Sequence, residues 1–294
     1  MSEPLSGRIA VVTGAGAGLG RAEALGLAAD GATVIVNDLA AALEASDVVD
    51  EIAAAGGRAV PVTGDIADAA TAAEIMRVAT EELGGLHIVV SNAGITRDAM
   101  LFNMTDDQWD AVVRVHLRGH FLLNRNAAAY WRAQSKQAGG PVYGRLINTA
   151  SEAGLLGPAG QANYGAAKAG ITALTLSASR ALANYGITAN AICPRARTAM
   201  TAQVFGEAPA GRVDPLSPDH VVTLVRYLAG PAAGQVSGQV FVVYGPTVML
   251  MAAPTIRETF TADGDEWDPA ALSDRLSSFF EHADSATFSA QDLI

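Results

Sequence analysis

RIAVVTGAGAGLG (residues 8–20) is the stretch that decides how this chain folds. Its first part is a run of small and β-branched apolar residues, which is typical of a buried strand, and the glycines after it permit a tight turn. The residues that follow, LGRAEALGLAADG (19–31), have the length and composition of a helix. A strand that passes through a glycine-rich turn into a helix is the first half of a β–α–β unit.

Six further strand candidates follow, separated by longer helical stretches. They are ATVIVND (32–38), RAVPVTGD (58–65), LHIVVSNAG (86–94), GRLINTAS (144–151), GITANAICP (186–194) and GQVFVVYG (238–245). Continuous apolar strands that alternate with helices imply a parallel sheet covered on both faces. We therefore predict an α/β fold, a single-domain, Rossmann-like, doubly wound parallel sheet of seven strands over residues 1–245.

Residues 246–294 form a predicted C-terminal extension with one helix, DPAALSDRLSSFFE (268–281). Asp268 is a suitable N-cap, and Pro269 suits the first helical position. The helix carries an apolar stripe of Leu272, Leu276, Phe279 and Phe280. A stripe of this kind needs a surface to cover, and we expect that surface to be the chain's own domain or a neighbouring subunit.

Composition excludes several classes of function. The chain has 294 residues, half of them hydrophobic, and a net charge of −11, which disfavours binding to nucleic acid or to an anionic membrane. The apolar run VFVVYGPTVMLMAAP (240–254) is broken by a Gly-Pro pair and is too short to span a bilayer. The single cysteine, Cys193, fits a reducing compartment and a place in the core, so we expect a cytoplasmic protein with no metal site. We expect no signal peptide, because the first strand begins by residue 8.

The glycine-rich turn is the first candidate binding site. Its glycines let the backbone approach a pyrophosphate, and the following helix N-terminus offers N–H groups and positive dipole to it. The turn lies between the first strand and the first helix, where a dinucleotide-binding motif must lie, and no Lys-Ser/Thr pair follows as in a P-loop. The predicted contacts are Gly14, Gly16, Gly18, Leu19 and Gly20.

Polar side chains at the ends of the next strands extend this site. Asp38 ends the second strand, 24 residues after Gly14, where a carboxylate binds ribose hydroxyls and repels a 2′-phosphate. This position favours NAD over NADP, although Asp38 also suits an N-cap of the next helix. Asp65 and Ile66 are placed to meet the adenine, and Asn92, Ala93 and Gly94 end the fourth strand near the point where the strand order reverses.

Taken together, these residues resemble the short-chain dehydrogenase/reductase family over about residues 6–245. The shared motifs are T-G-x-x-x-G-x-G at 13–20, N-A-G at 92–94, Ser151 and Y-x-x-x-K at 164–168, in the family's order and spacing. A narrower similarity, in VVTGAGAGLGRA, VNDL, RVHLRGHF and GQANYGAAKAG, is to the dehydrogenase domain of peroxisomal multifunctional β-oxidation enzymes. The same segments resemble bacterial 3-hydroxyacyl-CoA and 17β-hydroxysteroid dehydrogenases.

The resemblance implies a hydride transfer between a secondary alcohol and NAD, with Ser151, Tyr164 and Lys168 as catalytic residues. Tyr164 and Lys168 lie four residues apart on a predicted helix, so they share a face. A nearby ammonium favours phenolate, and we expect Lys168 to lower the pKa of Tyr164 from about 10. The family also places the tyrosine and the lysine at the cofactor, together with Pro194 and Thr198.

The chain departs from the family pattern in two places. His116 stands where the family has an asparagine that implies a proton relay, and an imidazole is able to serve the same relay or simply to satisfy a backbone carbonyl. Arg195 follows Pro194 where the family has glycine. Arg195 and Arg197 are candidates to meet an anionic substrate or the cofactor pyrophosphate, and solvation of both side chains is an equal alternative.

The segment 199–220, with Met200, Val204 and Phe205, corresponds to the family's substrate cover and suits a lipid-like molecule. We therefore expect a 3-hydroxyacyl-CoA or a hydroxysteroid as substrate, and a homodimer or homotetramer as the family implies. Two alternatives remain open. One is an NADPH-dependent 3-oxoacyl-[acyl-carrier-protein] reductase, against which Asp38 counts, and the other is a non-catalytic nucleotide-sensing protein.

Overall fold

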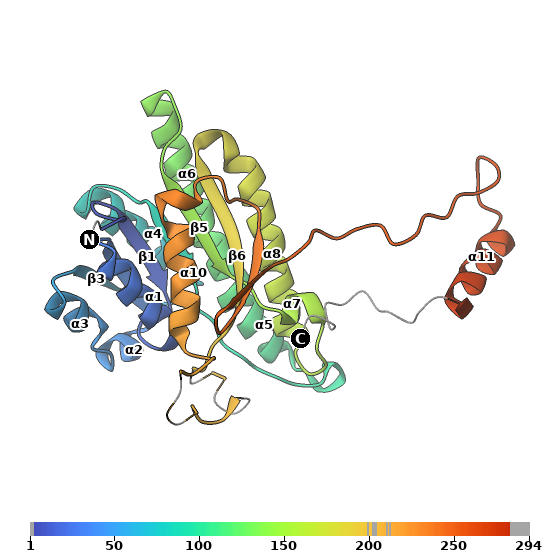
Figure 1. The fold of residues 1–294 in the computed structure, drawn as a ribbon, viewed down its shortest axis with the longest axis horizontal. Helices are drawn as coiled ribbons and strands as arrows, with labels where there is room; N and C mark the ends of the chain where they lie inside the picture. The colour runs from blue at the N-terminus through green and yellow to red at the C-terminus, as the bar shows by residue number, and fades with distance from the viewer. Residues whose placement is uncertain (1–2, 199, 202–204, 210, 212, 283–294) are drawn as a thin grey trace. The chain divides into compact units, whose positions relative to one another are not determined.

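The computed structural model describes residues 3–198, 200–201, 205–209, 211 and 213–282. The chain divides into two compact units, Met1–Met251 and Ala252–Ile294. The first unit contains one eight-stranded sheet in the order β3-β2-β1-β4-β5-β6-β7-β8 (Figure 1). The strands are β1 (Ile9–Thr13), β2 (Thr33–Asp38), β3 (Arg58–Thr63), β4 (Ile88–Ser91), β5 (Gly144–Thr149), β6 (Ile187–Arg195), β7 (Val240–Tyr244) and β8 (Thr247–Leu250).

Strands β1 to β7 are parallel and correspond to the seven predicted strands, so the predicted Rossmann-like fold is confirmed. The sequence pattern does not predict β8, which pairs antiparallel with β7 and forms the edge of the sheet beyond residue 245. Tyr244 pairs with Thr247, so the hairpin turn contains only Gly245 and Pro246. Gly245 has a φ of 52°, and a positive φ followed by proline fits a type II′ hairpin turn.

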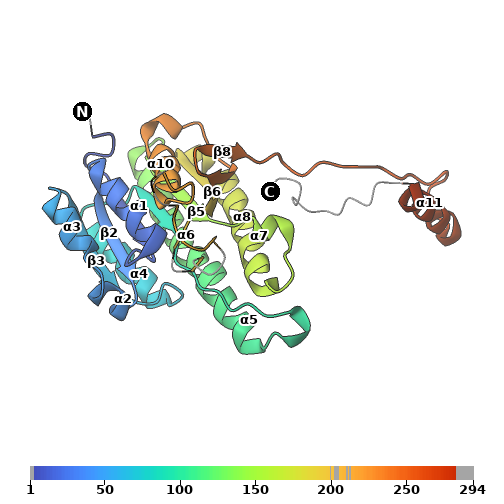
Figure 2. The ribbon, with the colours of Figure 1, turned by 60° about the horizontal axis from the view of Figure 1, so that its bottom comes forward.

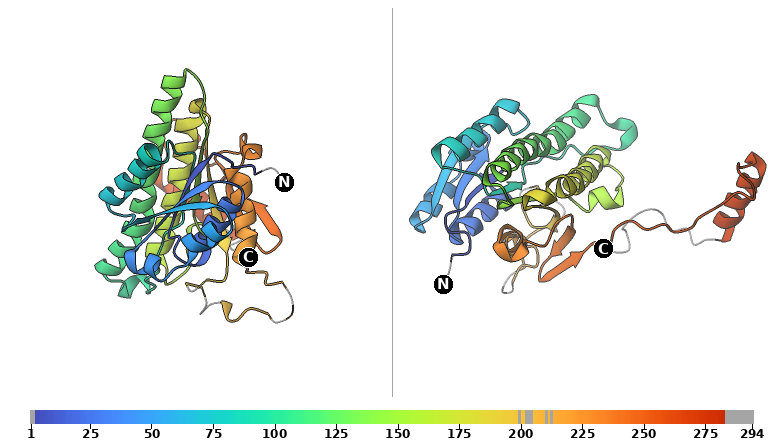
Figure 3. Two further views of the ribbon diagram at one scale, coloured as in Figure 1. Left: turned by 90° about the vertical axis from the view of Figure 1, so that its left-hand side faces the viewer. Right: turned by 90° about the horizontal axis from the view of Figure 1, so that it is seen from above.

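Helices cover both faces of the sheet (Figure 3). Along β1, Ala10 and Val12 join a core cluster with residues of α1, α3 and α10, whereas Ile9 and Val11 join a second cluster with residues of α4, α6 and α8. This alternation is what a strand buried on both faces requires. The α-helices of this unit are α1 (Gly18–Ala29), α2 (Ala40–Glu44), α3 (Val48–Ala54), α4 (Ala69–Arg77), α5 (Asp106–Val113), α6 (Gly119–Ala138), α7 (Ala153–Leu156), α8 (Ala162–Leu182) and α10 (Pro218–Ala229).

Among the described residues, shorter helical turns join these elements. Two are π-helical, η1 (Val78–Glu82) and η3 (Arg114–Arg118), and the latter links α5 to α6. Three are 3₁₀ turns, η2 (Leu101–Asn103), η4 (Ala183–Tyr185) and η5 (Pro231–Ala233). Helices α5 and α7 both pack on α8 at the end where the parallel strands finish (Figure 2).

A buried polar chain fixes α6 and α8 against the middle of the sheet. Asn124 of α6 donates from Nδ2 to Oδ1 of Asn148 at 3.0 Å, and Asn148 donates from its own Nδ2 to Oγ1 of Thr175 on α8 at 2.9 Å. Thr175 in turn donates to the carbonyl of Ile171 at 2.8 Å. Each buried amide therefore has a partner, and the register of α8 against β5 is held by hydrogen bonds as well as by packing.

The second unit contains the predicted helix as α11 (Pro269–His282). Asp268 accepts a hydrogen bond at Oδ2 from the backbone N–H of Ala271, as an N-cap does. Phe279 makes edge-to-face contacts with Phe260 and Phe280 within the unit. The surface that this helix covers in the assembled protein stays a prediction. Among the described helices, none combines the length and the apolarity that crossing a membrane requires.

Candidate active site

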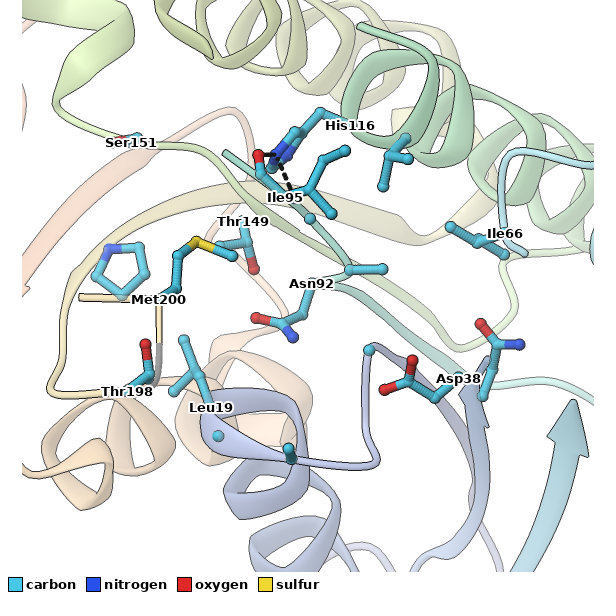
Figure 4. Close-up of a pocket in the computed structure, with 18 of the residues that line it drawn as sticks. Leu19, Asp38, Ile66, Asn92, Ile95, His116, Thr149, Ser151, Thr198 and Met200 are labelled. Carbon is cyan, nitrogen blue, oxygen red and sulfur yellow. Dashed lines mark hydrogen bonds between the residues drawn. The ribbon is translucent and has the colours of Figure 1, made fainter. Parts of the chain in front are cut away.

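A cavity of about 370 Å³ lies at the carboxyl ends of the parallel strands, where the strand order reverses between β1 and β4. Figure 4 shows Asp38 and Ser151 on opposite sides of this pocket, with Asn92 between them. Ligands of doubly wound sheets bind at this crossover point. Apart from two glycines, every residue predicted for the site lines the cavity.

The two exceptions, Gly16 and Gly20, act behind the lining. A Cβ on Gly20 would lie 2.3 Å from the carbonyl oxygen of Gly14, so only glycine lets α1 pack this closely on the turn. Gly14 itself has a φ of 67° and faces the backbone of Ala93. Gly16 donates its N–H to Oδ2 of Asp38 at 3.0 Å. The glycines thus bring the turn, α1 and the β2 end together beside the cavity.

The N-terminus of α1 opens directly onto the pocket. Ala17, Gly18 and Leu19 line the cavity, and no described side chain caps the helix or places an acid in its first turn. Its first N–H groups are therefore left for a ligand, and the helix dipole favours an anion there. This arrangement fits the pyrophosphate of a dinucleotide.

Asp38 and Asp65 mark the far side of the pocket. Asp38 accepts the N–H groups of Gly16 and, at 2.8 Å, of Leu39, and among the described residues it has no cationic partner. Asp65 accepts the N–H of Ala67 at 2.8 Å and pairs with Arg114 at 2.6 Å. The carboxylate at the end of β2 is thus free to accept ribose hydroxyls, whereas that of Asp65 is shared with an arginine.

Asn92 and Ala93 tie the end of β4 to β1. The N–H groups of both residues donate to Oγ1 of Thr13, at 3.0 and 3.1 Å, and Nδ2 of Asn92 donates to the Thr13 carbonyl at 3.2 Å. These hydrogen bonds join the ends of β1 and β4 and hold the part of the pocket that lies between Asp38 and Ser151.

Ser151, Tyr164 and Lys168 converge on the opposite end of the cavity. Lys168 is buried, lies with its Nζ 5.4 Å from the Tyr164 ring centroid, and donates to the carbonyl of Thr149 at 2.6 Å. Burial lowers the pKa of Lys168 to about 7. Burial raises the pKa of Tyr164, while the hydrogen bond with Ser151 acts in the opposite direction. The expected lowering of the Tyr164 pKa is therefore not found, because burial outweighs the hydrogen bond with Ser151.

His116 lies on η3 and faces Tyr164. The two rings are edge-to-face with centroids 5.2 Å apart. Nε2 of His116 lies 3.0 Å from the N–H nitrogen and 2.7 Å from the carbonyl oxygen of Ile95, and its Nδ1 is buried without a partner among the described residues. Burial and the charge of Lys168 lower its pKa, so the imidazole is neutral. The carbonyl of His116 lies 2.7 Å from Nδ1 of His120.

The two arginines after β6 are engaged by acids. Arg195 makes a bidentate pair with Glu152, and Arg197 pairs with Asp214 at 2.9 Å. Arg197 also donates to the carbonyls of Phe205, at 2.6 Å, and of the next residue. Free solvation therefore does not describe these side chains, and contact with an anionic ligand stays a prediction.

Thr198 and Met200 line the pocket at the start of the predicted substrate cover, and Val204 lies outside the described residues. Several residues that line the cavity in the structure were not predicted from the sequence motifs. They are Ala17, Asn37, Leu39, Gly64, Ile95, Val115, Thr149, Ala150, Ala196 and Thr201. Most of them are direct neighbours of predicted residues at strand ends. Their position next to those residues in the sequence is the feature from which they could have been predicted.

The profile described as short chain dehydrogenase matches residues 8–208 of this chain. The chain belongs to the short-chain dehydrogenase family. It is an oxidoreductase of that family, and its Rossmann-like pocket binds a nicotinamide nucleotide. The resemblance predicted from the sequence motifs is thereby confirmed.

Three relatives narrow the comparison. Hydroxyacyl-CoA dehydrogenase ChsB1 of Mycobacterium tuberculosis is 66% identical over an alignment of 299 positions, which covers 99% of this chain and 94% of the relative. The 3-oxoacyl-[acyl-carrier-protein] reductase of Synechocystis is 38% identical over 84% of this chain and 99% of the relative. The peroxisomal hydratase-dehydrogenase-epimerase of Saccharomyces cerevisiae is 37% identical over 94% of this chain and 30% of the relative, so the predicted narrower similarity is also confirmed.

A solved structure supports the fold. The crystal structure of a short chain dehydrogenase from Mycobacterium avium is 43% identical, with a TM-score of 0.85 over 97% of this chain and 98% of that chain.

Proposed function

We propose that the protein is an NAD(H)-dependent dehydrogenase that interconverts a 3-hydroxyacyl-CoA and the corresponding 3-oxoacyl-CoA. The observation that carries the proposal is a single pocket with Asp38 at one end and Ser151, Tyr164 and Lys168 at the other. The name of the ChsB1 relative supports the choice of an acyl-CoA. A hydroxysteroid of similar bulk is the runner-up.

The residues around the pocket fit NAD. The open N-terminus of α1 would hold the pyrophosphate, Asp38 would accept the adenosine ribose hydroxyls, and Ile66 would pack on the adenine. Asp38 has no described cationic partner to neutralise a 2′-phosphate, which supports NAD over NADP. The nicotinamide, when bound, accepts or returns the hydride.

Tyr164 moves the proton in this scheme. Its phenol takes the proton of the substrate hydroxyl during oxidation and returns it to the carbonyl oxygen during reduction, and Ser151 holds the same oxygen by a hydrogen bond. Both side chains line one end of the cavity. Lys168 supplies the positive charge that a developing phenolate requires, from a buried position where charges interact strongly.

We also propose a cytoplasmic homo-oligomer. The single cysteine is buried and free, as suits a reducing compartment. Trp109 of α5 and Phe121 of α6 are large apolar side chains that are partly exposed, and the central helices are where we expect a second copy to pack.

The test follows the oxidation of NADH and, separately, of NADPH with three carbonyl substrates. These are a medium-chain 3-oxoacyl-CoA, the same acyl group on acyl carrier protein, and a 17-ketosteroid. Preferred turnover of the acyl-CoA with NADH supports the proposal. Preferred turnover of the carrier-protein thioester with NADPH would support the 3-oxoacyl-[acyl-carrier-protein] reductase instead. Faster turnover of the 17-ketosteroid would support a hydroxysteroid, and not an acyl-CoA, as the substrate. NADH binding without turnover of any carbonyl would support a nucleotide sensor.

A further inference from the structure

A half-buried ion pair lies directly behind the catalytic serine. Arg195 donates from Nε and Nη2 to the two carboxylate oxygens of Glu152, at 2.6 and 2.7 Å. The side chains are only 20% and 15% exposed. Two parallel charge-assisted bonds away from bulk water form a strong and directional contact, unlike an exposed surface pair.

The pair joins three elements that surround the reacting end of the pocket. Glu152 immediately follows Ser151 and precedes α7, and the N–H of Ala153 donates to Oγ of Ser151 at 3.1 Å. Arg195 is the last residue of β6 and follows the pocket-lining Pro194. Its guanidinium also lies 5.4 Å from the ring centroid of Tyr244 at the end of β7.

The pair lies close to the reacting groups, because Glu152 is the chain neighbour of Ser151 and Ser151 hydrogen-bonds Tyr164. Burial is the main cause that raises the pKa of the Cys193 thiol, and the carboxylate of Glu152 adds to it. Either charge left alone in this half-buried place would act on a phenolate that develops nearby, in opposite directions. As a pair, the two charges largely cancel.

We propose that Glu152 and Arg195 are positioning residues that hold the Ser151 turn against β6 and keep the site electrically balanced for ionisation of Tyr164. This inference rests on the proposed catalytic role of Tyr164. It also accounts for an arginine where the family pattern has glycine, because the residue after Ser151 supplies its partner.

The test compares Glu152→Gln, Arg195→Met and the double variant. The readout is the fraction of Tyr164 ionised at pH 10.5, from NMR of protein with ¹³C-labelled tyrosine, with the signal assigned by its loss in Tyr164→Phe. Arg195→Met leaves the carboxylate alone and is expected to raise the pKa of Tyr164 by about one pH unit. Glu152→Gln leaves the guanidinium alone and is expected to lower it by a similar amount, and the double variant is expected to lie near the wild type.

The other titratable groups around Tyr164 are unchanged in these variants. They are His116 on η3, Lys168 on α8, Cys193 on β6 and Asp98 in the loop after β4, which accepts a hydrogen bond from Gln161. A difference in ionisation therefore originates in the exchanged pair, which acts on Tyr164 directly or through the Cys193 thiol. Circular dichroism and thermal melting confirm that each variant is folded before its signal is compared.

Turnover supplies the second readout. We expect about a tenfold loss of kcat in the two single variants with NADH affinity unchanged, because a displaced Ser151 affects the reaction and not cofactor binding. Arg195→Lys keeps the charge without the bidentate geometry, so it should preserve the Tyr164 ionisation and still lower kcat.

Shifts in the same direction in both single variants, or none in either, would overturn the electrostatic role, and unchanged kcat would overturn the positioning role. A wild type that turns over no substrate contradicts the proposed function, while the ionisation readout still decides on the pair.

Discussion

Individual side chains set the chemistry at the reacting end of the pocket, and their environment is more apolar than the motif suggests. Lys168 is buried with its pKa lowered to about 7, and the pKa of Tyr164 is raised by burial. The motif predicts which residues meet, because i and i+4 share a helix face. It does not predict their ionisation, which depends on how much of the surrounding sheet and helices excludes water.

His116 is the residue whose role is most open to experiment. We expect His116→Ala to lower turnover more than NADH affinity, because the imidazole contacts the Tyr164 ring and lies away from Asp38 (Figure 4). His116→Asn restores the family residue and should retain more turnover than the alanine variant. Steady-state kinetics and NADH fluorescence titration measure the two effects, and full turnover in His116→Ala would leave the histidine with a structural role only.

Asp38 determines the expected choice of cofactor. We expect Asp38→Ala to weaken NADH binding roughly 10- to 100-fold, because hydrogen bonds to a charged group contribute about 1.5–3 kcal/mol. The same change should reduce the discrimination against NADPH, since the repelling carboxylate is gone. Titration of both nucleotides by fluorescence checks this, and an unchanged NADH affinity would mean that Asp38 serves only its contacts with Gly16 and Leu39.

Glu23 of α1 is fully buried, and neither of its carboxylate oxygens has a partner among the described residues. Burial raises its pKa from 4.5 to about 8. As the pH rises, the folded state therefore keeps a proton that the unfolded state loses. The contribution of the Glu23 carboxyl to the free energy of unfolding is complete below about pH 4.5 and is lost as the pH rises through about 8.

We expect Glu23→Gln to remove this loss. The free energy of unfolding of the variant should gain on the wild type by about 1.4 kcal/mol for each pH unit inside this window. Urea denaturation at pH 5, 7 and 9 measures the difference, and Glu44→Gln, at an exposed glutamate of α2, is the matched control. Parallel stability curves for the wild type and Glu23→Gln would contradict the assignment.

At the scale of elements, the sequence predicts what local patterns encode. The seven parallel strands and the turn before α1 follow from apolar runs and glycines, and all are present. Strand β8 was missed because its four residues carry too little pattern, and only Gly245 and Pro246 signal the hairpin. The π-helical turn at His116 and the pairing of Arg195 with Glu152 depend on neighbours distant in sequence, so spacing along the chain does not reveal them.

The polar chain between α6, β5 and α8 makes a prediction at this scale. Asn148→Ala leaves Nδ2 of Asn124 without its acceptor and Oγ1 of Thr175 without its donor in the core. Because each unsatisfied buried group costs about 1–3 kcal/mol, we expect a loss of roughly 2–4 kcal/mol in the free energy of unfolding. Denaturant melts measure it, with Asn126→Ala, a partly exposed position on the same helix α6 as Asn124, as control. A loss no larger than in the control would show that packing alone holds α8.

At the scale of the whole first unit, the position of the site follows from topology. Seven parallel strands in the order 3-2-1-4-5-6-7 place the ends of β1, β2, β4, β5 and β6 along one edge. Most predicted residues follow these strand ends, whereas Tyr164 and Lys168 come from α8 and His116 from η3. Chain order and strand polarity therefore place Asp38 and Ser151, which are far apart in sequence, in one pocket. The strand topology does not determine which substrate binds, because the substrate is expected to contact the predicted cover, residues 199–220.

The most direct test of the central claim is the initial rate of NADH formation from a medium-chain 3-hydroxyacyl-CoA with saturating NAD, in the wild type and in Tyr164→Phe. The phenylalanine variant keeps the ring beside His116 and removes only the proton-transferring hydroxyl. The account predicts clear turnover by the wild type and a loss of at least about 100-fold in kcat in the variant, with NADH binding retained. Equal turnover by the two proteins would contradict the assignment of Tyr164 as the catalytic acid and base.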